Sequence, residues 1–390
     1  MTYSPDNYGY YTYKNFKTYS KYDIMTIASS TDDVCWHYND NFFSMYDWTK
    51  EPTQTLSELY KNRAIQLRNE YDYIVIMYSG GADSSNVLES FVKNNIPIDE
   101  VCHTINLKGT NDINSHVNKE IFVTAKPKIE QYILNYNLKI KHRFIDMTDH
   151  IVEYFNESNK FDFIHQSQNY YNPNVNAKAS LYKKIPDWQD LVEAGKKICI
   201  VWGAEKPIIT GNNNNFYFQF MDTLDGSISM AHQNSKPRGI TDELFYWAPT
   251  DSCAKIIIKQ SHICKKTLEF LLKTKIHPQY KSNEEINCRV RQQDGKMLLF
   301  GGQHVKKLIY PYFVSEEFNA PKSKFGIFLG ERETWFWQKY NERPAKIFLN
   351  GIEHIQKSIQ PDWLLGNITC LGKQFPEKVK KLPSKLYALQ

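Results

Sequence analysis

The segment at residues 74–85 constrains the fold of this chain more than any other, because an apolar run leads directly into two glycines. It reads IVIMYSGGADSS. The five residues before Ser79 are apolar or aromatic, as in a strand buried on both faces of a sheet. Gly80 and Gly81 allow the backbone to turn sharply and bring its amides close to a ligand. The pattern predicts a buried strand, a tight turn and a helix at residues 84–93.

The turn has the chemistry of an anion site. The predicted helix points its free N–H groups and the positive end of its dipole toward the turn. Hydroxyls of Ser79, Ser84 and Ser85 add further donors, and the combination favours phosphate. The alternative is an ordinary strand-to-helix turn in which Asp83 or Ser84 caps the helix.

The same residues resemble a known motif. Residues 79–85, SGGADSS, are similar to the SGGxDS(S) pyrophosphate loop of the PP-loop ATP pyrophosphatase superfamily. That superfamily includes asparagine synthetase, GMP synthetase, NAD synthetase and argininosuccinate synthetase. The motif differs from a Walker loop because no Gly-Lys-Ser/Thr follows it. The resemblance is closest over residues 72–95, extends in pattern to about residue 210, and is absent beyond.

The resemblance implies an AMP-forming ligase that binds ATP and Mg²⁺. It assigns the ATP and pyrophosphate contacts to Ser79, Gly80, Gly81, Ala82, Asp83, Ser84 and Ser85. Asp83 is expected to serve the metal ion as well, since Mg²⁺ prefers one or two carboxylates together with phosphate oxygens. A carboxylate or carbonyl oxygen of the acceptor attacks the α-phosphorus and pyrophosphate leaves. An amine or ammonia then resolves the adenylate.

A second polar stretch follows another apolar strand. Residues 201–207, VWGAEKP, loosely resemble the acidic loop after the corresponding strand in asparagine synthetase-like proteins. We expect Glu205 to bind Mg²⁺ or orient a substrate, and Lys206 to neutralise phosphate, so both join Asp83 as catalytic candidates. The alternative is a polar loop with a surface ion pair. Residues 242–245, DELF, also resemble that family, but they follow no apolar strand, and a capped turn is the alternative there.

The end of the second predicted strand, at His103, Thr104 and Ile105, is expected to line the adenine pocket, as the resemblance implies. Packing of these side chains is the alternative. The histidines show no HxxxH or HExxH spacing that indicates zinc. Cys253 and Cys264 are expected to be structural thiols, because helical spacing does not place them and the nearby histidine on one face.

Strands and helices alternate over residues 73–202, which predicts an α/β fold with a doubly wound, mostly parallel sheet. Strands are expected at residues 73–78, 100–105, 139–145 and 197–202, with the third at an edge. The ligand is expected at the carboxyl ends of these strands, where Ser79 lies. The expected division is an N-terminal extension at residues 1–70, a PP-loop domain at 71–240, and a mainly helical substrate or lid region at 241–390.

Three local patterns lie outside this alternation. Residues 24–28 are interpreted as a short strand. Residues 55–69 have a helical apolar stripe, and Thr55 with Glu58 forms a predicted capping box at its start. A short hairpin is expected from the segments at residues 216–220 and 226–231.

Composition narrows the class of protein. The hydrophobic fraction of 41% and the charged fraction of 23% are usual for a globular protein, and no apolar run approaches the roughly 18 residues of a membrane span. The seven cysteines are scattered, and the N-terminus has no secretory pattern, which favours free thiols in a reducing compartment. We therefore expect a cytoplasmic location, or the host cytoplasm if the protein is viral, a source that the Tyr-, Asn- and Lys-rich composition suggests.

The acceptor and the nitrogen source stay open. The net charge of +5 is modest. The one basic cluster comprises Lys373, Lys378, Lys380, Lys381 and Lys385. We expect it to be solvated, with contact to a nucleic-acid backbone as the alternative. The roughly 70 residues before the first predicted strand are too few for the glutaminase domain of asparagine synthetase, so nitrogen comes from free ammonia, another amine or a separate glutaminase. The alternatives to a small-molecule ligase are an enzyme that modifies a tRNA or DNA base, and a non-catalytic nucleotide-binding protein.

Overall fold

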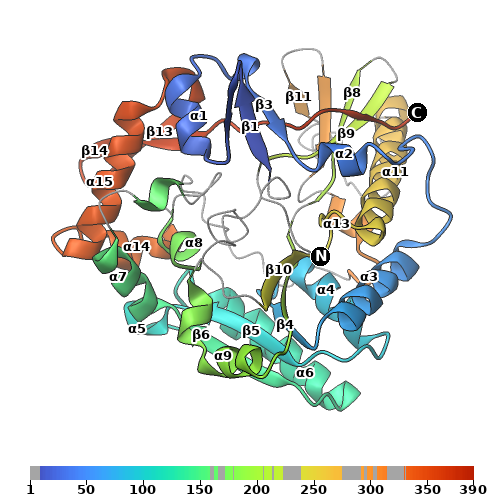
Figure 1. Ribbon diagram of the computed structural model, residues 1–390, viewed down its shortest axis with the longest axis horizontal. Coiled ribbons are helices and arrows are strands. Elements are labelled where there is room, and N and C mark those ends of the chain that lie inside the picture. The colour runs from blue at the N-terminus through green and yellow to red at the C-terminus, as the bar shows by residue number, and fades with distance from the viewer. Residues whose placement is uncertain are drawn as a thin grey trace.

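The computed structural model describes most of the chain. The described residues are 9–158, 162–165, 172–178, 180–204, 206–212, 215–222, 239–274, 291–293, 297–301, 305–313, 329 and 331–390. Glu205 and the predicted strand at residues 226–231 lie outside these ranges. Figure 1 shows two groups of strands on opposite sides of the molecule, with the long helices α11 (Asp251–Thr274) and α15 (Arg343–Ser358) at its flanks.

One sheet is parallel throughout and is built around the glycine-containing segment. Its order is β10 (Ile240–Leu244), β7 (Ile198–Trp202), β4 (Tyr73–Met77), β5 (Glu100–Ile105) and β6 (Lys141–Asp146). The first of these strands in the chain, β4, lies at the centre, with β5 and β6 added on one side and β7 and β10 on the other. This order matches the first five strands of a Rossmann-type doubly wound sheet, and its switch point lies between β4 and β7. The predicted α/β fold with a parallel sheet is confirmed.

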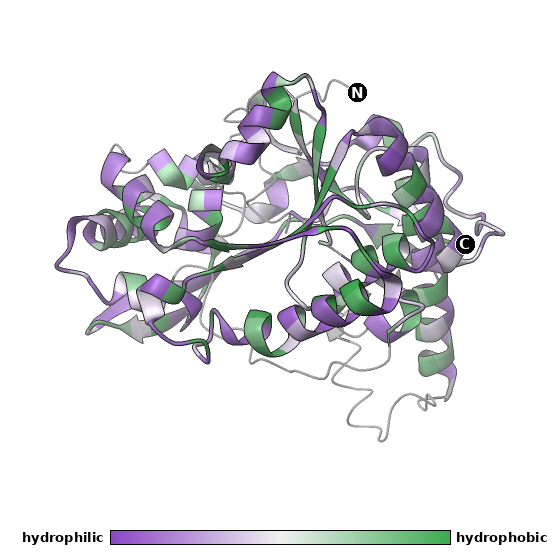
Figure 2. Ribbon diagram, turned by 90° about the horizontal axis from the view of Figure 1, so that it is seen from below, coloured by the Kyte–Doolittle hydropathy of each residue, from purple (hydrophilic) through white to green (hydrophobic). Residues whose placement is uncertain are grey.

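Burial explains why these strands form where they do. Residues 74–76 of β4 are fully buried, and every residue of β7 is buried, as expected for central strands of a parallel sheet. The edge strand β6 is mostly half-buried, in agreement with its alternating sequence. Helix α3 (Leu56–Glu70) begins with the predicted capping box between Thr55 and Glu58. Figure 2 shows hydrophobic and hydrophilic residues alternating around the helices, as expected for helices with one buried face.

The strand predicted at residues 24–28 was wrong. Most of this segment belongs to helix α1 (Lys21–Ile27), whose first turn is capped by the hydroxyl of Ser20. The apolar residues Ile24 and Met25 sit on the buried face of that helix. A three-stranded antiparallel sheet of β2 (Phe16–Thr18), β1 (Tyr10–Tyr13) and β3 (Cys35–His37) accounts for the remaining strands of the N-terminal extension.

Residues 241–390 were expected to be mainly helical, but their described part also contains several strands. A second five-stranded sheet has the order β11 (Arg291–Gln293), β12 (Met297–Gly301), β8 (Ile208–Asn212), β9 (Asn215–Gln219) and β15 (Tyr387–Ala388), and its pairs are antiparallel. A separate hairpin joins β13 (Leu364–Cys370) and β14 (Lys373–Val379). The described partner of β9 in its hairpin is β8. The pairs β12–β8 and β15–β9 join segments that lie far apart in the chain, so local periodicity does not reveal how this sheet is assembled.

The N-terminal extension is joined to the C-terminal part by buried polar contacts. The ammonium of Lys21 lies 2.6 Å from the carboxylate of Asp222, and both side chains are fully buried. Asp222 also accepts hydrogen bonds from the hydroxyl of Tyr11 at 3.1 Å and the backbone amide of Leu382 at 2.8 Å. Breaking a buried pair of this kind costs about 3–5 kcal/mol, so the described part of the N-terminal extension, residues 9–70, is part of the folded unit. Among the described residues, no helix has the length and apolar character needed to cross a bilayer.

Candidate functional site

The glycine turn is held in one conformation by its neighbours. Gly80 has a φ of +83°, a region that L side chains rarely adopt, and a Cβ at this position would lie 3.0 Å from the Cβ and backbone nitrogen of Ala125. Gly81 is the N-cap of α4 (Ala82–Val92), with a φ of −70°. The predicted strand–turn–helix is therefore present, and the free amides of α4 face the carboxyl edge of the parallel sheet.

Serine hydroxyls preorganise this turn. The hydroxyls of Ser79 and Ser84 lie 3.2 Å apart, and the hydroxyl of Ser84 donates to the carbonyl of Gly81 at 3.1 Å. Ser85 lies 3.2 Å from the hydroxyl of Tyr78. Ser84 and Ser85 are buried and support the turn from inside, whereas Ser79 is exposed. The surface that a ligand can reach is thus formed by Ser79, the two glycines and Asp83.

Asp83 is the most strongly held carboxylate at the turn. The ammonium of Lys206 lies 2.9 Å from its Oδ1, and the hydroxyl of Tyr310 donates to the same atom. Burial alone would raise the pKa of Asp83, but the charges of Lys206 and Lys306 and the bond from Tyr310 lower it overall. Burial and the neighbouring carboxylate raise the pKa of Tyr310 well above its ordinary value, so Tyr310 stays protonated and donates.

The loop after β7 packs directly against the start of α4. A Cβ on Gly203 would lie 2.9 Å from the backbone carbonyl of Asp83 and from the Cα of Ser84. Only glycine allows this approach, which brings Lys206 to Asp83. The two segments that sequence singled out, at residues 79–85 and 201–207, therefore meet at the switch point of the sheet. Glu205 lies outside the described residues.

The acidic residues Asp242 and Glu243 are bonded to side chains within the fold. The alternative of a capped turn was wrong, because both residues belong to strand β10. Asp242 accepts from the indole of Trp202 at 2.6 Å. Glu243 lies 2.8 Å from the guanidinium of Arg63 and accepts from Tyr71 at 2.9 Å. Buried carboxylates with such partners are satisfied within the fold, and the partners explain how a polar sequence forms a sheet strand.

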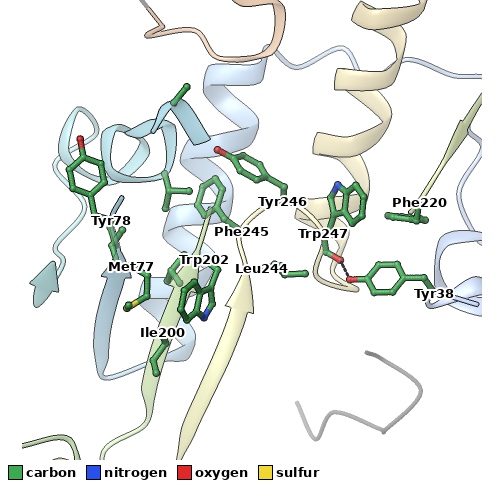
Figure 3. Close-up of a cluster of buried hydrophobic side chains, with 14 of the residues drawn as sticks. Tyr38, Met77, Tyr78, Ile200, Trp202, Phe220, Leu244, Phe245, Tyr246 and Trp247 are labelled. Atoms are coloured by element: carbon green, nitrogen blue, oxygen red, sulfur yellow. Dashed lines mark hydrogen bonds between the residues drawn. The ribbon is translucent and has the colours of Figure 1, made fainter. Parts of the chain in front are cut away.

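The segment that directly follows β10 contacts the turn through Tyr246. In Figure 3, Tyr246 and Trp247 point in different directions, and a dashed line joins Trp247 to Tyr38. The hydroxyl of Tyr246 donates to the backbone carbonyl of Asp83 at 3.0 Å. Tyr38 donates to the carbonyl of Trp247 at 2.7 Å, and Trp247 packs edge-on against Phe220 in a buried aromatic core. Residue 246 thus belongs to the site, and residue 247 to the core.

His103 lies beneath the turn. Its side chain is fully buried, and its Nδ1 donates to the carbonyl of Tyr78 at 2.7 Å. Its Nε2 therefore accepts from Nε2 of His142, 2.8 Å away. Burial lowers the pKa of His103 to about 4. Ile105 is buried and Thr104 is half-buried, so the side chains predicted to line the adenine pocket lie within or beside the sheet. Of these three residues, His103 supports the turn, because it holds the carbonyl of Tyr78, the residue before Ser79.

Two further charged residues adjoin the turn on the β5 side, and sequence reasoning missed both. A carboxylate oxygen of Glu120 lies 3.5 Å from the position that a Cβ on Gly81 would occupy. The guanidinium of Arg332 lies 2.8 Å from the other oxygen of Glu120. Glu120 is one acid in a polar stretch, and Arg332 lies 212 positions away, so no local signal marks them. Lys306 and Tyr310, on the Asp83 side, were missed for the same reason.

The remaining candidates have structural partners. Cys253 and Cys264 are buried free thiols, and the thiol of Cys253 contacts the carbonyl of Phe245 at 3.3 Å. Three lysines of the basic cluster pair with acids: Lys373 with Glu353, Lys378 with Glu377, and Lys380 with Asp362. In the part of the chain that the structure describes, no group of three or more His, Cys, Asp or Glu side chains is arranged to hold a metal ion.

Comparison of the sequence with known proteins does not place the chain in a family. No protein-family model matches the chain, and no curated protein matches it. The similarity of residues 79–85 to the PP-loop motif stays a prediction.

Proposed function

We propose that the protein is an ATP-dependent, AMP-forming ligase that activates a carboxylate or carbonyl oxygen. The observation that carries this proposal is the position of the turn. A helix N-terminus, two glycines and the hydroxyl of Ser79 lie at the switch point of a Rossmann-like sheet, with Lys206 beside them. Ligands of doubly wound sheets bind at that point, and backbone amides at a helix N-terminus bind phosphate.

The residues suit the chemistry of adenylate formation. Amides of the turn hold the phosphates that leave as pyrophosphate, while Lys206 and Lys306 stabilise the negative charge that develops on the leaving group. The acceptor oxygen bonds to the α-phosphorus as the bond from that phosphorus to pyrophosphate breaks. An amine or ammonia then attacks the adenylate and AMP leaves.

The donor set fits Mg²⁺. The carboxylate of Asp83 and the hydroxyl of Ser79 are hard oxygen ligands, and magnesium commonly uses one or two carboxylates with phosphate oxygens. When bound, Mg²⁺ neutralises phosphate charge. Because Lys206 and Tyr310 both contact Oδ1 of Asp83, Oδ2 would serve the metal, and Lys206 would remain beside the phosphates.

Product analysis tests the proposal. The full chain is incubated with Mg²⁺, α-labelled ATP and mixtures of carboxylic acids, amides and nucleosides, with ammonia present. We expect acceptor-dependent formation of AMP and pyrophosphate in equal amounts. Acceptor-dependent release of ADP and orthophosphate would contradict the proposal, because it places the broken bond between the β- and γ-phosphates. Nucleic-acid acceptors belong in the same screen, although the paired lysines of the basic cluster give them no particular support.

A further inference from the structure

The side chain of Glu120 stands beside a turn built to bind anions. One of its carboxylate oxygens faces Gly81, and the carboxylate is 13% exposed. A phosphate in the turn would feel this charge, and Coulomb's law gives about a fivefold loss of affinity for two unit charges about 4 Å apart even in bulk water. A carboxylate in this position therefore weakens phosphate binding unless a cation accompanies it.

A widened helical turn places Glu120 there. Residues Ile121–Ala125 form a π-helix, in which the amide of Lys126 donates to the carbonyl of Ile121. This turn spans the distance between Glu120, which faces Gly81, and Ala125, which packs against Gly80. Single π-turns are rare and occur frequently at functional sites. Both ends of the π-turn contact the two glycines, so the turn positions the carboxylate relative to the phosphate cradle.

Arg332 is the cation that accompanies Glu120 in this state. The two form a single ion pair of 2.8 Å, and Arg332 is 36% exposed. A partly exposed pair of this kind contributes little to stability and exchanges its partners readily. Guanidinium groups bind phosphate oxygens as well as carboxylates, so Arg332 has a second partner available as soon as phosphate enters the turn.

We propose that Glu120 and Arg332 form an exchangeable pair in which Glu120 becomes a ligand of the Mg²⁺ that enters with the phosphates and Arg332 moves onto phosphate oxygens. This inference rests on the proposed function. It makes Glu120 a second acidic residue of the metal site, on the opposite side of the turn from Asp83. It also gives the C-terminal part of the chain, through Arg332, a direct contact with the nucleotide.

Binding of Mn²⁺ and inorganic pyrophosphate to the full chain tests this directly. Free Mn²⁺ is measured by electron paramagnetic resonance with and without pyrophosphate, and pyrophosphate binding is measured separately without metal. For Glu120→Gln we expect about tenfold weaker Mn²⁺ binding in the presence of pyrophosphate, and severalfold tighter pyrophosphate binding in the absence of metal. For Arg332→Met we expect weaker pyrophosphate binding in both conditions. Glu130→Gln, which removes an exposed carboxylate paired with Lys126 on the following helix, is the matched control and changes neither.

Three outcomes overturn the inference. If Glu120→Gln binds Mn²⁺ and pyrophosphate as the unmodified chain does, the pair is only structural. If it weakens pyrophosphate binding equally with and without metal, Glu120 supports the turn and is no metal ligand. If the unmodified chain binds neither pyrophosphate nor Mn²⁺ with pyrophosphate, the proposed function fails, and this inference fails with it.

Discussion

The glycine turn has two flanks, and each presents one carboxylate paired with one cation. On the β7 flank, Asp83 is in contact with Lys206 and Tyr310, and its backbone carbonyl accepts from Tyr246. On the β5 flank, Glu120 meets Arg332 in a single, partly exposed pair. The first flank is fixed by several buried groups, so the fold itself sets its geometry. The second has one exchangeable contact, so it is suited to change when a ligand enters.

Asp83→Asn should give the largest effect. The substitution keeps the volume of the side chain and removes the charge that Lys206, Lys306 and a metal ion share. We expect AMP formation to fall by about 100-fold or more, as when a charge-stabilising group is removed from an active site. Initial rates of AMP release measure this, with Asp149→Asn, an exposed carboxylate paired with Lys108, as the control. Unchanged activity in a folded Asp83→Asn chain would remove Asp83 from the mechanism.

A pair of alanine substitutions compares the rigidity of the two flanks. Gly203→Ala places a Cβ 2.9 Å from the backbone of Asp83 and Ser84, which cannot move without disturbing α4. We expect a loss of about 1–3 kcal/mol in the free energy of unfolding. Gly81→Ala meets only the side-chain oxygens of Ser79 and Glu120, at 3.3 and 3.5 Å, and should cost much less. Denaturant unfolding measures both, and equal losses would mean that the flanks are equally rigid.

Tyr310→Phe tests a single contact of the β7 flank. It removes the hydroxyl that donates to Asp83 and leaves the ring in place. A hydrogen bond to a charged group contributes about 1.5–3 kcal/mol, and we expect a loss in unfolding free energy toward the lower end of that range because Lys206 remains. Tyr312→Phe is the control, because Tyr312 is close to Tyr310 in the chain but its ring lies beside Lys93. It should leave the free energy of unfolding unchanged. A neutral Tyr310→Phe would show that Lys206 alone holds Asp83.

The β5 side should show a dependence on pH. The pKa of His103 falls to about 4 in the folded chain, against about 6.5 for an exposed histidine. Below about pH 6.5, His103 is therefore protonated in the unfolded chain but stays neutral in the folded chain. The free energy of unfolding falls as the pH drops from about 6.5 to 4, by up to about 1.4 kcal/mol per pH unit.

His103→Gln removes this proton uptake. The slope of unfolding free energy against pH should then become shallower in that window and stay unchanged above it. His142 shares the hydrogen bond and also has a pKa lowered by burial, so His142→Gln should have a smaller effect in the same direction. Equal slopes in the unmodified and His103→Gln chains would contradict the neutral pair beneath the turn.

Local patterns predicted the part of the site that local structure builds. The run at residues 74–85 predicted the strand, the turn and the helix. The apolar strand predicted at residues 197–202, which is β7, placed Lys206 at the same edge of the sheet. Tyr310 and Arg332 had no local signal, because they meet their partners across 227 and 212 positions of the chain. Helical periodicity does not distinguish a single π-turn from an ordinary α-helical turn, so the pattern of residues 121–125 gave no sign that Glu120 faces the glycines. Strand β10 was missed because its acids find partners in Arg63 and Trp202 only after folding.

The most direct test of the central claim is calorimetric titration of the full chain with inorganic pyrophosphate and Mg²⁺. Two glycines make a matched comparison, because Gly80 and Gly195 both have positive φ, but only Gly80 packs against another element, at Ala125. We expect one pyrophosphate per chain, bound more tightly than orthophosphate, with binding lost in Gly80→Ala and retained in Gly195→Ala. Absence of binding, or equal binding by both variants, would contradict a pyrophosphate site at the turn.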